Sequence, residues 1–243
     1  MNSQSASLQA YMPFLLDGIW VTLQITAAAM ALAIPVAFLL AAGRMSRFAI
    51  ARLSAGFVIE LFRGTSAVVQ LFWAFYVLPL FGITLSPMVA GILVLGLNEG
   101  SYFSEVVRAS LRSIVVGQRE ACVALHLPRG YAFFRIILPQ ALPVMIPPFG
   151  NALILMLKFT ALVSLVTVQD LSFRADQIRT ALGVSGEIYG VVLLIYFAMA
   201  MVLAYGVAVL ERAANRWAGR PVPTLLPRLG GRASPVPRWA LGR

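Results

Sequence analysis

Residues 117–148 read GQREACVALHLPRGYAFFRIILPQALPVMIPP and separate two long apolar runs. The polar part of this stretch is longer than a simple connection between two helices requires. Glu120, Ala121 and Ala124 recur at helical spacing, and Pro128 limits how far such a helix extends. A short helix with small residues on one face is suited to docking into a groove of a partner, whereas a surface helix lying on the bilayer is the alternative interpretation.

The composition predicts an all-α, polytopic membrane protein. The 243 residues are 60% hydrophobic and 12% charged, whereas roughly a quarter of a soluble domain is charged. Apolar runs longer than the ~18 residues that a spanning helix needs recur along the chain. We expect five transmembrane helices, at about 17–42, 55–80, 86–110, 137–168 and 188–211. Four prolines lie in the fourth run, at positions 139, 143, 147 and 148. Because a proline removes a backbone donor, this run is expected to enter the membrane through a kinked or irregular stretch.

The basic residues predict the orientation of the chain. Most of the 19 Lys and Arg residues lie in three alternating segments, 43–54, 108–136 and the region from Arg212 onward. Because basic segments stay on the cytoplasmic side, the N-terminus is expected outside and the C-terminus in the cytoplasm. The net charge of +10 is therefore interpreted as a topology signal, and nucleic acid is not expected as a partner.

This topology divides the chain into three parts. Residues 1–16 are expected to form an extracytoplasmic N-terminus, and residues 17–217 a transmembrane domain with the cytoplasmic loop 117–139. Residues 218–243 are rich in Pro, Gly and Arg, so they are expected to form a disordered cytoplasmic tail.

Several kinds of site are not expected in this chain. The single Cys122 excludes an internal disulfide, and without a Cys/His cluster no metal or redox site is expected. The sequence has no GxxxxGK[ST] run, so the chain is not expected to bind ATP in a P-loop of its own. An integral-membrane enzyme would need clustered ionisable groups at one depth, and the sequence offers few.

The stretch after Arg112 resembles the EAA loop of ABC-importer permeases. The residues that carry the resemblance begin at Gly117 and are Glu120-Ala121-Cys122, Ala124-Leu125 and Ile136-Ile137-Leu138-Pro139-Gln140-Ala141. Cys122 replaces the second Ala of the family pattern, and His126 stands where the family usually has Gly. The second replacement bears on the turn after the helix, and we interpret His126 as a surface-loop residue.

The resemblance implies that residues 117–139 contain a coupling helix seated in a cleft of a cytoplasmic ATP-binding subunit. Glu120 is then the expected polar contact to that subunit. Closure of the ATP-binding dimer would move the helix and tilt the attached spans, which alternating access requires. In this interpretation ATP and Mg²⁺ belong to the partner ATPase, and this chain binds no cofactor.

Further stretches are similar to the polar amino-acid branch of these permeases, in the same order from about residue 15 to residue 217. They are Leu16-Asp17-Gly18-Ile19-Trp20-Val21-Thr22-Leu23, Glu60-Leu61-Phe62-Arg63-Gly64-Thr65 with Val69-Gln70-Leu71, the series Asn98, Tyr102, Glu105 and Arg108, and Pro148-Phe149-Gly150-Asn151 with Leu157-Lys158. The chain departs from the branch at Ser66, often Pro, and at Phe159, usually acidic. Ectoine and hydroxyectoine permeases also resemble it, so ectoine is a substrate hypothesis beside ordinary amino acids.

Polar residues within the predicted spans are candidates for the substrate pathway, because an unpaired charge at membrane depth is costly. The candidates are Asn98, Glu99, Lys158, Thr160 and Ser164. Glu99 is expected near the membrane midplane, where it would face the cationic half of a zwitterion while Lys158 meets the carboxylate. A mutual Glu99–Lys158 pair, or pairing across a subunit interface, is the alternative. For Thr160 and Ser164 the alternative is a hydrogen bond to their own helix.

Two intramembrane ion pairs are predicted from a spacing of three residues on one helix. They are Glu60 with Arg63 and Glu105 with Arg108. Both lie near the expected cytoplasmic ends of their spans, where a structural role is the preferred interpretation.

The combined prediction is a type I ABC-importer permease in the bacterial plasma (inner) membrane, which forms half of a translocation pathway. Its expected partners are an ATP-binding subunit, a second permease subunit (homologous or identical), an extracytoplasmic solute-binding protein and a small zwitterionic substrate. The alternative is an ATP-independent channel or secondary carrier, which has no need of the 117–139 loop.

Overall fold

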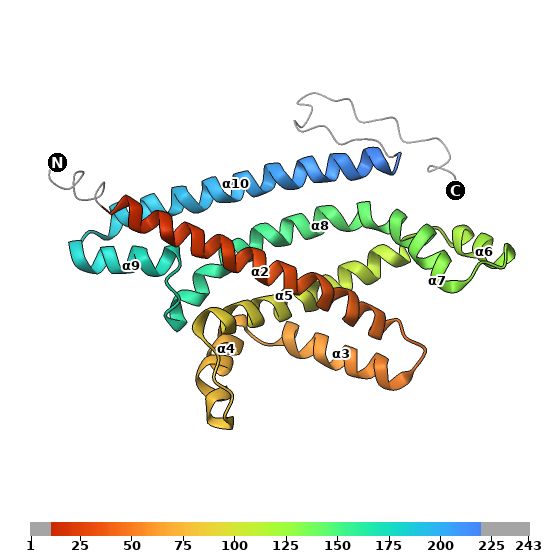
Figure 1. The fold of residues 1–243 in the computed structure, drawn as a ribbon, viewed down its shortest axis with the longest axis horizontal. Coiled ribbons are helices and arrows are strands. Elements are labelled where there is room, and N and C mark those ends of the chain that lie inside the picture. Colours follow the sequence, from red (N-terminus) through yellow and green to blue (C-terminus); the bar gives the residue numbers. More distant parts are fainter. Residues whose placement is uncertain (1–10, 220–243) are drawn as a thin grey trace, which may run out of the picture.

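The computed structural model describes residues 11–219, and these residues form helices and turns without a β-strand. Four long helices run along the length of the molecule: α2 (Met12–Arg44), α5 (Pro87–Arg112), α8 (Leu138–Phe159) and α10 (Ser185–Trp217) (Figure 1). The predicted disordered tail lies, from residue 220 onward, outside the described residues, and so do residues 1–10 of the predicted N-terminal segment.

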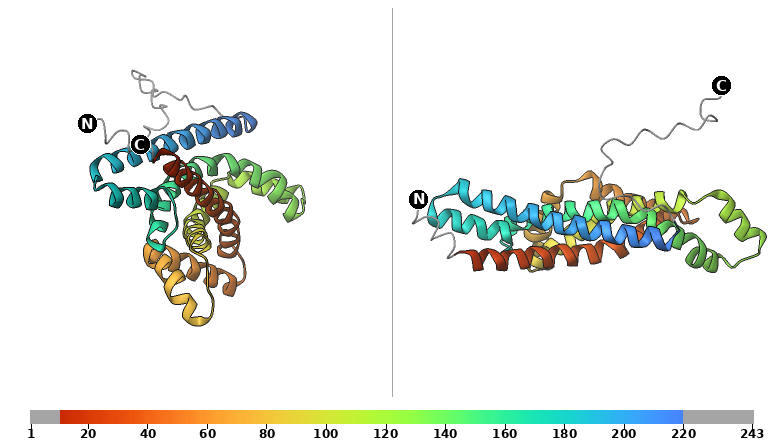
Figure 2. Two further views of the ribbon diagram at one scale, coloured as in Figure 1. Left: turned by 60° about the vertical axis from the view of Figure 1, so that its left-hand side comes forward. Right: turned by 90° about the horizontal axis from the view of Figure 1, so that it is seen from above.

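Shorter elements join the long helices. Between α2 and α5 lie α3 (Ala49–Gly64), α4 (Ala67–Phe72), the π-helical η1 (Trp73–Val77) and the 3-10 helix η2 (Leu78–Phe81). Between α5 and α8 lie α6 (Val116–Ala124), α7 (Arg129–Tyr131) and the π-helical η3 (Ala132–Ile137). The 3-10 helix η4 (Thr160–Val166) and α9 (Leu171–Leu182) connect α8 to α10. Helices α6 and α7 lie at one end of the elongated molecule and α9 at the other (Figure 1 and Figure 2).

Helices α2 and α5 share the most extensive contact among the described elements, because small residues line it. Four alanines of α2, one turn apart, are at most 1% exposed: Ala29, Ala33, Ala37 and Ala41. On α5, a Cβ at Gly100 would lie only 2.7 Å from Val36 Cγ1 and 3.1 Å from Ala33 O. Since lipid is as apolar as a leucine side chain, such close van der Waals contact between small residues is what holds helices together in a membrane.

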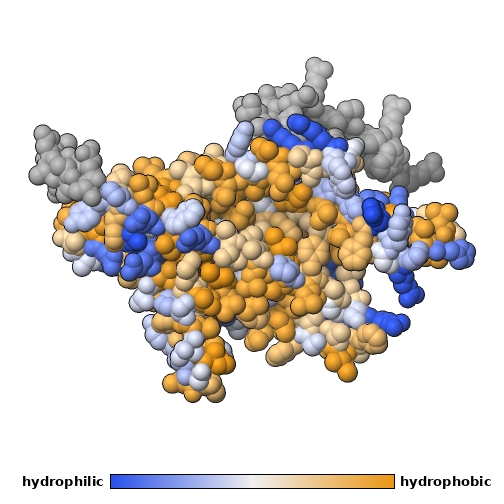
Figure 3. All heavy atoms as spheres, in the orientation of Figure 1, coloured by the Kyte–Doolittle hydropathy of each residue, from blue (hydrophilic) through white to orange (hydrophobic). Residues whose placement is uncertain are grey.

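On the face shown in Figure 3, the surface between the two ends is mainly hydrophobic, and hydrophilic residues gather toward the ends. Helix α10 exposes large apolar side chains along its length: Leu193 is 67%, Phe197 63% and Val202 70% exposed. A long helix with this much exposed apolar surface is suited to contact with lipid.

The number of spans is three or four by length and composition. Met12–Arg44, Arg129–Val166 and Ser185–Trp217 are long and apolar enough to cross a membrane, and the bent pair Ala49–Gly64 and Ala67–Phe81 adds a fourth if it counts as one span. The predicted number of five is therefore not confirmed. The predicted third span, 86–110, is helical as α5, but its polar centre lowers its hydropathy.

The predicted first and last spans are helices with longer ends than expected, α2 and α10. Because α2 already begins at Met12, the predicted N-terminal segment 1–16 is partly helical. The predicted fourth run is continuous from Arg129 to Val166. Its entry is irregular, as its prolines indicate, because η3 adds a π-helical turn just before Pro139.

The predicted continuous helix 55–80 is wrong, because the chain forms two helices bent by 103° at Thr65 and Ser66. Both residues have extended backbone angles, with ψ of 152° and 132°. The Thr65 hydroxyl donates to Leu61 O at 2.6 Å and so gives the last turn of α3 a partner other than the next backbone N–H. Since α3 begins at Ala49, the predicted loop 43–54 is also largely helical.

The connection predicted at 169–187 contains a helix that was not expected, α9. Its first residue is preceded by Asp170, whose carboxylate accepts a hydrogen bond from Phe173 N at 2.9 Å. Its end is followed by Gly183, whose φ of 70° favours glycine. These are ordinary signals for the start and end of a helix. The helix was not predicted because it is short and less apolar than the neighbouring runs.

Asp170 is fully buried, and this residue and its neighbour Leu171 tie α9 to two long helices. Tyr196 OH of α10 donates to Asp170 Oδ2 at 3.5 Å, and Leu171 N donates to Thr22 Oγ1 of α2 at 3.2 Å. Burial raises the pKa of the Asp170 carboxyl to about 6, although the hydrogen bond from Phe173 N–H opposes the shift.

The close contact of α2 and α5 predicts that Gly100→Leu destabilises the protein. Overpacking a tight contact costs about 1–3 kcal/mol, so the unfolding temperature of the purified protein should fall. Gly206→Leu is the matched control, because a Cβ at Gly206 meets no atom within 4 Å. Equal unfolding temperatures for the two variants would contradict the contact.

The raised pKa of Asp170 predicts a pH-dependent stability. Its ordinary pKa is 3.8 and its folded pKa about 6, so the native state binds the proton more tightly and the free energy of unfolding falls as pH rises through this window. Asp170→Asn keeps a helix-capping side chain without the charge and should flatten this dependence in thermal unfolding at about pH 4 and pH 7.

The control for this prediction is Asp176→Asn. The hydrogen bond from Arg179 lowers the pKa of the Asp176 carboxyl below its ordinary 3.8, so its contribution is lost only at lower pH and this variant should leave the difference between pH 4 and pH 7 nearly unchanged. If Asp170→Asn and the unaltered protein lose the same stability between the two pH values, the assignment to Asp170 fails.

Candidate functional site

Helix α6 lies at one end of the molecule (Figure 1), where one of its faces is exposed and the other is anchored. Five residues of the predicted coupling loop are exposed on this helix and just after it: Gly117, Glu120, Ala121, Ala124 and Leu125. On the opposite side, Cys122 is only 6% exposed, and Arg119 Nη2 donates to Leu111 O in the last turn of α5 at 2.6 Å. One face therefore fixes α6 to the molecule, and the other is available to a partner.

The turn after α6 is the left-handed turn that glycine usually makes, and His126 adopts it with a φ of 52°. The His126 N–H donates to Val123 O at 2.9 Å, and the Leu127 N–H donates to Cys122 O at 3.0 Å. This pattern is a Schellman motif, so the chain retains the turn although His replaces Gly, at a backbone cost of about 1 kcal/mol. His126 is exposed, as the sequence predicts for a surface-loop residue.

The exposed helix is connected to three long helices. Residues 113–115 join α6 to α5, and α7 and η3 join it to α8, whose first turn contains the partly buried Pro139. An apolar hollow behind α6 is lined by Cys122, by Phe133 of η3 and by Met45 at the end of α2. A displacement of α6 is therefore expected to move the adjacent ends of α2, α5 and α8.

Polar side chains hold the bend between α3 and α4. Asn98 of α5 donates through Nδ2 to Phe62 O at 2.9 Å and to Gln70 Oε1 at 3.0 Å. Gln70 Nε2 in turn donates to Phe62 O at 2.9 Å and to Thr65 Oγ1 at 2.6 Å. The carbonyl that the helix break leaves without a backbone partner is thus satisfied by side chains, which non-helical backbone at membrane depth requires.

Glu99 and Lys158 do not pair within this chain. Glu99 is 3% exposed inside α5, whereas Lys158 is exposed on α8, and no ion pair within 4.0 Å joins them in residues 11–219. The alternative of a mutual pair is therefore wrong for the single chain. Contact of either residue with a substrate, or across a subunit interface, stays a prediction.

The hydroxyls of Thr160 and Ser164 bond to nearby backbone carbonyls, which was the alternative to a role in the substrate pathway. Thr160 Oγ1 donates to Leu157 O and Ser164 Oγ to Ala161 O, each at 2.7 Å. Both residues lie in η4, which contacts α5, the helix that carries Asn98 and Glu99. The pathway candidates thus lie on neighbouring elements, with three of their polar groups already bonded inside the chain.

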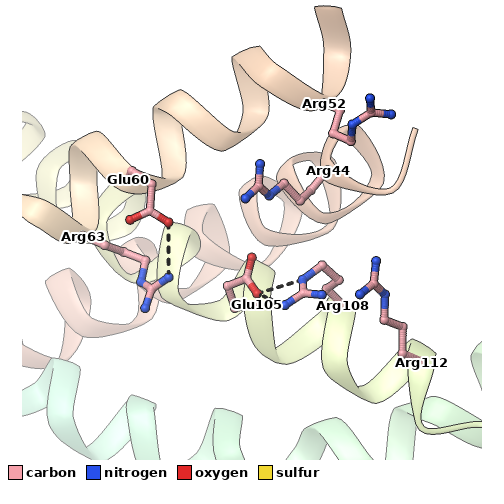
Figure 4. A pocket seen from close by; sticks show the side chains of 7 residues that line it. All are labelled: Arg44, Arg52, Glu60, Arg63, Glu105, Arg108 and Arg112. Atoms are coloured by element: carbon pink, nitrogen blue, oxygen red, sulfur yellow. Dashed lines mark hydrogen bonds and ion pairs between the residues drawn. The ribbon is translucent and has the colours of Figure 1, made fainter. Parts of the chain in front are cut away.

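The two pairs predicted from spacing lie beside one cavity. Arg63 Nη1 is 3.8 Å from Glu60 Oε1, and Arg108 Nε donates to Glu105 Oε2 at 2.8 Å. Three further arginines line the same cavity, between α3 and the ends of α2 and α5: Arg44, Arg52 and Arg112 (Figure 4). Because five of the seven lining residues are arginines and two are glutamates, this cavity is strongly basic.

Sequence reasoning missed two of these features. Gln70 was considered only as part of the family-like stretch. A polar residue five positions after Thr65 in an apolar stretch nevertheless indicates a hydrogen bond to nearby backbone. Sequence reasoning assigned Arg44 and Arg52 only to topology, because nothing in the order of the residues indicates that Arg112 lies beside them.

Comparison with known proteins agrees with this architecture. Residues 33–216 match the family described as binding-protein-dependent transport system inner membrane component. The probable amino-acid ABC transporter permease y4tF of Sinorhizobium fredii strain NGR234 is 41% identical over 208 residues, which cover 83% of this chain and 87% of that protein. The L-cystine transport system permease TcyB of Bacillus subtilis strain 168 is 34% identical over 87% of this chain and 91% of that protein.

A solved structure has the same fold. A chain in the crystal structure of an amino acid ABC transporter with histidines superposes with a TM-score of 0.80 and is 31% identical, over 86% of this chain and 97% of that chain.

The hydrogen bonds of Gln70 and Asn98 at the bend between α3 and α4 predict that substitutions of the two residues lower the stability in a coupled way. Gln70→Leu removes hydrogen bonds to Phe62 O and Thr65 and should lower the free energy of unfolding by about 1–2 kcal/mol. Because Gln70 and Asn98 bond to each other, the double variant with Asn98→Leu should lose clearly less than the sum of the single losses. Unfolding in detergent measures all three, with the exposed Gln118→Leu as control. Additive losses would show that the two side chains do not act together.

Proposed function

The chain belongs to the family of binding-protein-dependent transport system inner membrane components, and from this membership we propose that it is the permease subunit of an ATP-driven importer. The resemblance to ABC-importer permeases expected from the EAA-like stretch is thereby confirmed. The chain is a transport component, and ATP hydrolysis with its Mg²⁺ belongs to a separate ATP-binding subunit.

The single observation that carries the coupling proposal is the exposure of α6 on an anchored support. Its outward face holds Glu120 beside the small Ala121 and Ala124, and its inward face holds Arg119 bonded to α5. When an ATP-binding subunit moves a helix supported in this way, the displacement passes to α5 and α8. Small exposed residues also allow the close approach that a cleft on a partner requires.

We place the chain across the plasma membrane five times, with α5 as a span. Its 26 residues have a length of about 39 Å, which is sufficient to cross the hydrocarbon core. Helices α2, α3 and α8 contact α5, so its polar groups need not face lipid. The basic segments then place α6 and the C-terminus in the cytoplasm and α9 outside.

The proposed assembly contains a second permease subunit, identical or homologous, and a solute-binding protein on the outer side. One chain offers one coupling helix and half a pathway, in which Asn98, Glu99 and Lys158 are the residues proposed to meet the ligand. The relatives are named for amino-acid and L-cystine transport. We therefore propose a polar amino acid or a related zwitterion as substrate, with ectoine as a candidate to be tested beside it.

Uptake into liposomes that contain the assembled transporter tests this function. Glu120→Ala should lower ATP-dependent uptake at least severalfold, because it removes the polar contact to the ATPase. His126→Gly is the matched control on the same loop and should leave uptake unchanged, because glycine adopts the left-handed turn without strain. Uptake of cystine, glutamine, arginine, histidine and ectoine is compared in the same vesicles. Transport that proceeds without ATP would instead indicate a carrier, and ATP-dependent uptake that ignores Glu120→Ala would overturn the role proposed for Glu120.

A further inference from the structure

The cavity between α2, α3 and α5 has a volume of about 450 Å³ and is lined only by charged side chains (Figure 4). Arg44 comes from the end of α2, Arg52 from α3 and Arg112 from the end of α5. Arg44 and Arg112 are more than fifty positions apart in the sequence. The three arginines meet only because α3 folds back along α2 and α5. The cavity is therefore a product of the tertiary structure rather than of one basic run.

The carboxylates of the cavity are already engaged. Glu60 pairs with Arg63 and Glu105 with Arg108. No ion pair within 4.0 Å joins Arg44, Arg52 or Arg112 to a carboxylate in the part of the chain that the structure describes. None of these three guanidinium groups is thus paired directly with a carboxylate. Five arginines against two glutamates leave the hollow with an excess of positive charge, which favours an anion with several oxygen atoms.

The packing makes room for one of these arginines. A Cβ on Gly56 of α3 would collide with the Arg44 guanidinium, so the absence of a side chain at Gly56 lets Arg44 lie directly against α3. Gly56 itself is buried. The guanidinium of Arg44 is therefore seated at the cavity rather than extended into solvent.

An apolar stripe borders the cavity on α3. Ile50 is 84%, Leu53 69% and Phe57 69% exposed, and the three recur at helical spacing beside Arg52. A helix with a basic face next to an exposed apolar face is suited to the boundary between headgroups and acyl chains. The positive-inside orientation places this boundary in the cytoplasmic leaflet, where anionic lipids attract basic groups.

We propose that this cavity binds the phosphate group of an anionic phospholipid of the cytoplasmic leaflet. Arg44, Arg52 and Arg112 hold the phosphate oxygens, and the acyl chains lie along Ile50, Leu53 and Phe57. The site goes beyond the proposed transport function and uses from it only the orientation of the chain. Lipid binding is measured without transport, so a failure of one proposal leaves the other standing.

The test is the binding of phosphatidylglycerol to the assembled transporter, purified in neutral detergent and depleted of lipid, by native mass spectrometry. The double variant Arg44→Gln/Arg112→Gln should bind phosphatidylglycerol about 25-fold more weakly, because each of the two arginines proposed to hold the phosphate contributes roughly fivefold in affinity. The matched control, Arg212→Gln/Arg216→Gln, removes two basic residues at the predicted cytoplasmic end of α10 and should stay within about twofold. Phosphatidylcholine provides the zwitterionic comparison.

Further arms identify the source of the phosphate. Inorganic phosphate at millimolar concentration should neither bind with the same affinity nor displace the lipid. If it does both, the cavity is a site for a free anion and the lipid assignment is overturned. Equal losses in the two double variants, or no binding of added phosphatidylglycerol by the unaltered transporter, also overturn it. If the double variant unfolds, the exposed Arg112→Gln alone is measured, with an expected loss of about fivefold.

Discussion

Helix α5 carries polar and charged side chains through the middle of an apolar molecule, and the shielding of these groups organises the fold. Helices α2, α3 and α8 all contact α5. Helix α2 comes close because its buried alanines meet a face of α5 that lacks a side chain at Gly96 and Gly100. In hydrocarbon an unsatisfied polar group costs several kcal/mol. The most polar of the long helices, α5, is therefore surrounded by α2, α3 and α8.

The same polarity explains the break between α3 and α4. A free backbone carbonyl at Phe62 would be costly inside a membrane, and Asn98 of α5 and Gln70 of α4 both donate to it. The bend is therefore stabilised by the helix against which it lies. This arrangement joins three elements near the predicted pathway, so a movement of α5 is expected to alter the bend.

The two ends of the molecule are built for different contacts. At one end α6 is held by Arg119 and closed by the His126 turn, which leaves a small-residue surface outside. At the other end α9 is held by buried Asp170 and by Arg174, which is 3.2 Å from Asp17 of α2. The long helices between these ends are suited to transmitting a displacement, because close-packed interiors do not deform continuously.

The sequence by itself determined the class of the protein, its all-helical character, the alternating basic segments and the coupling-loop resemblance. These depend on hydropathy, residue order and charge within single segments, and none requires knowledge of a neighbour. Only the tertiary structure decided that 55–80 is broken, that Asn98 bonds to Gln70, that Glu99 and Lys158 lie apart and that Arg44, Arg52 and Arg112 share a cavity. Each of these depends on which faces of distant helices meet, and that choice is made by the close packing of small residues and by the need to bond every buried polar group.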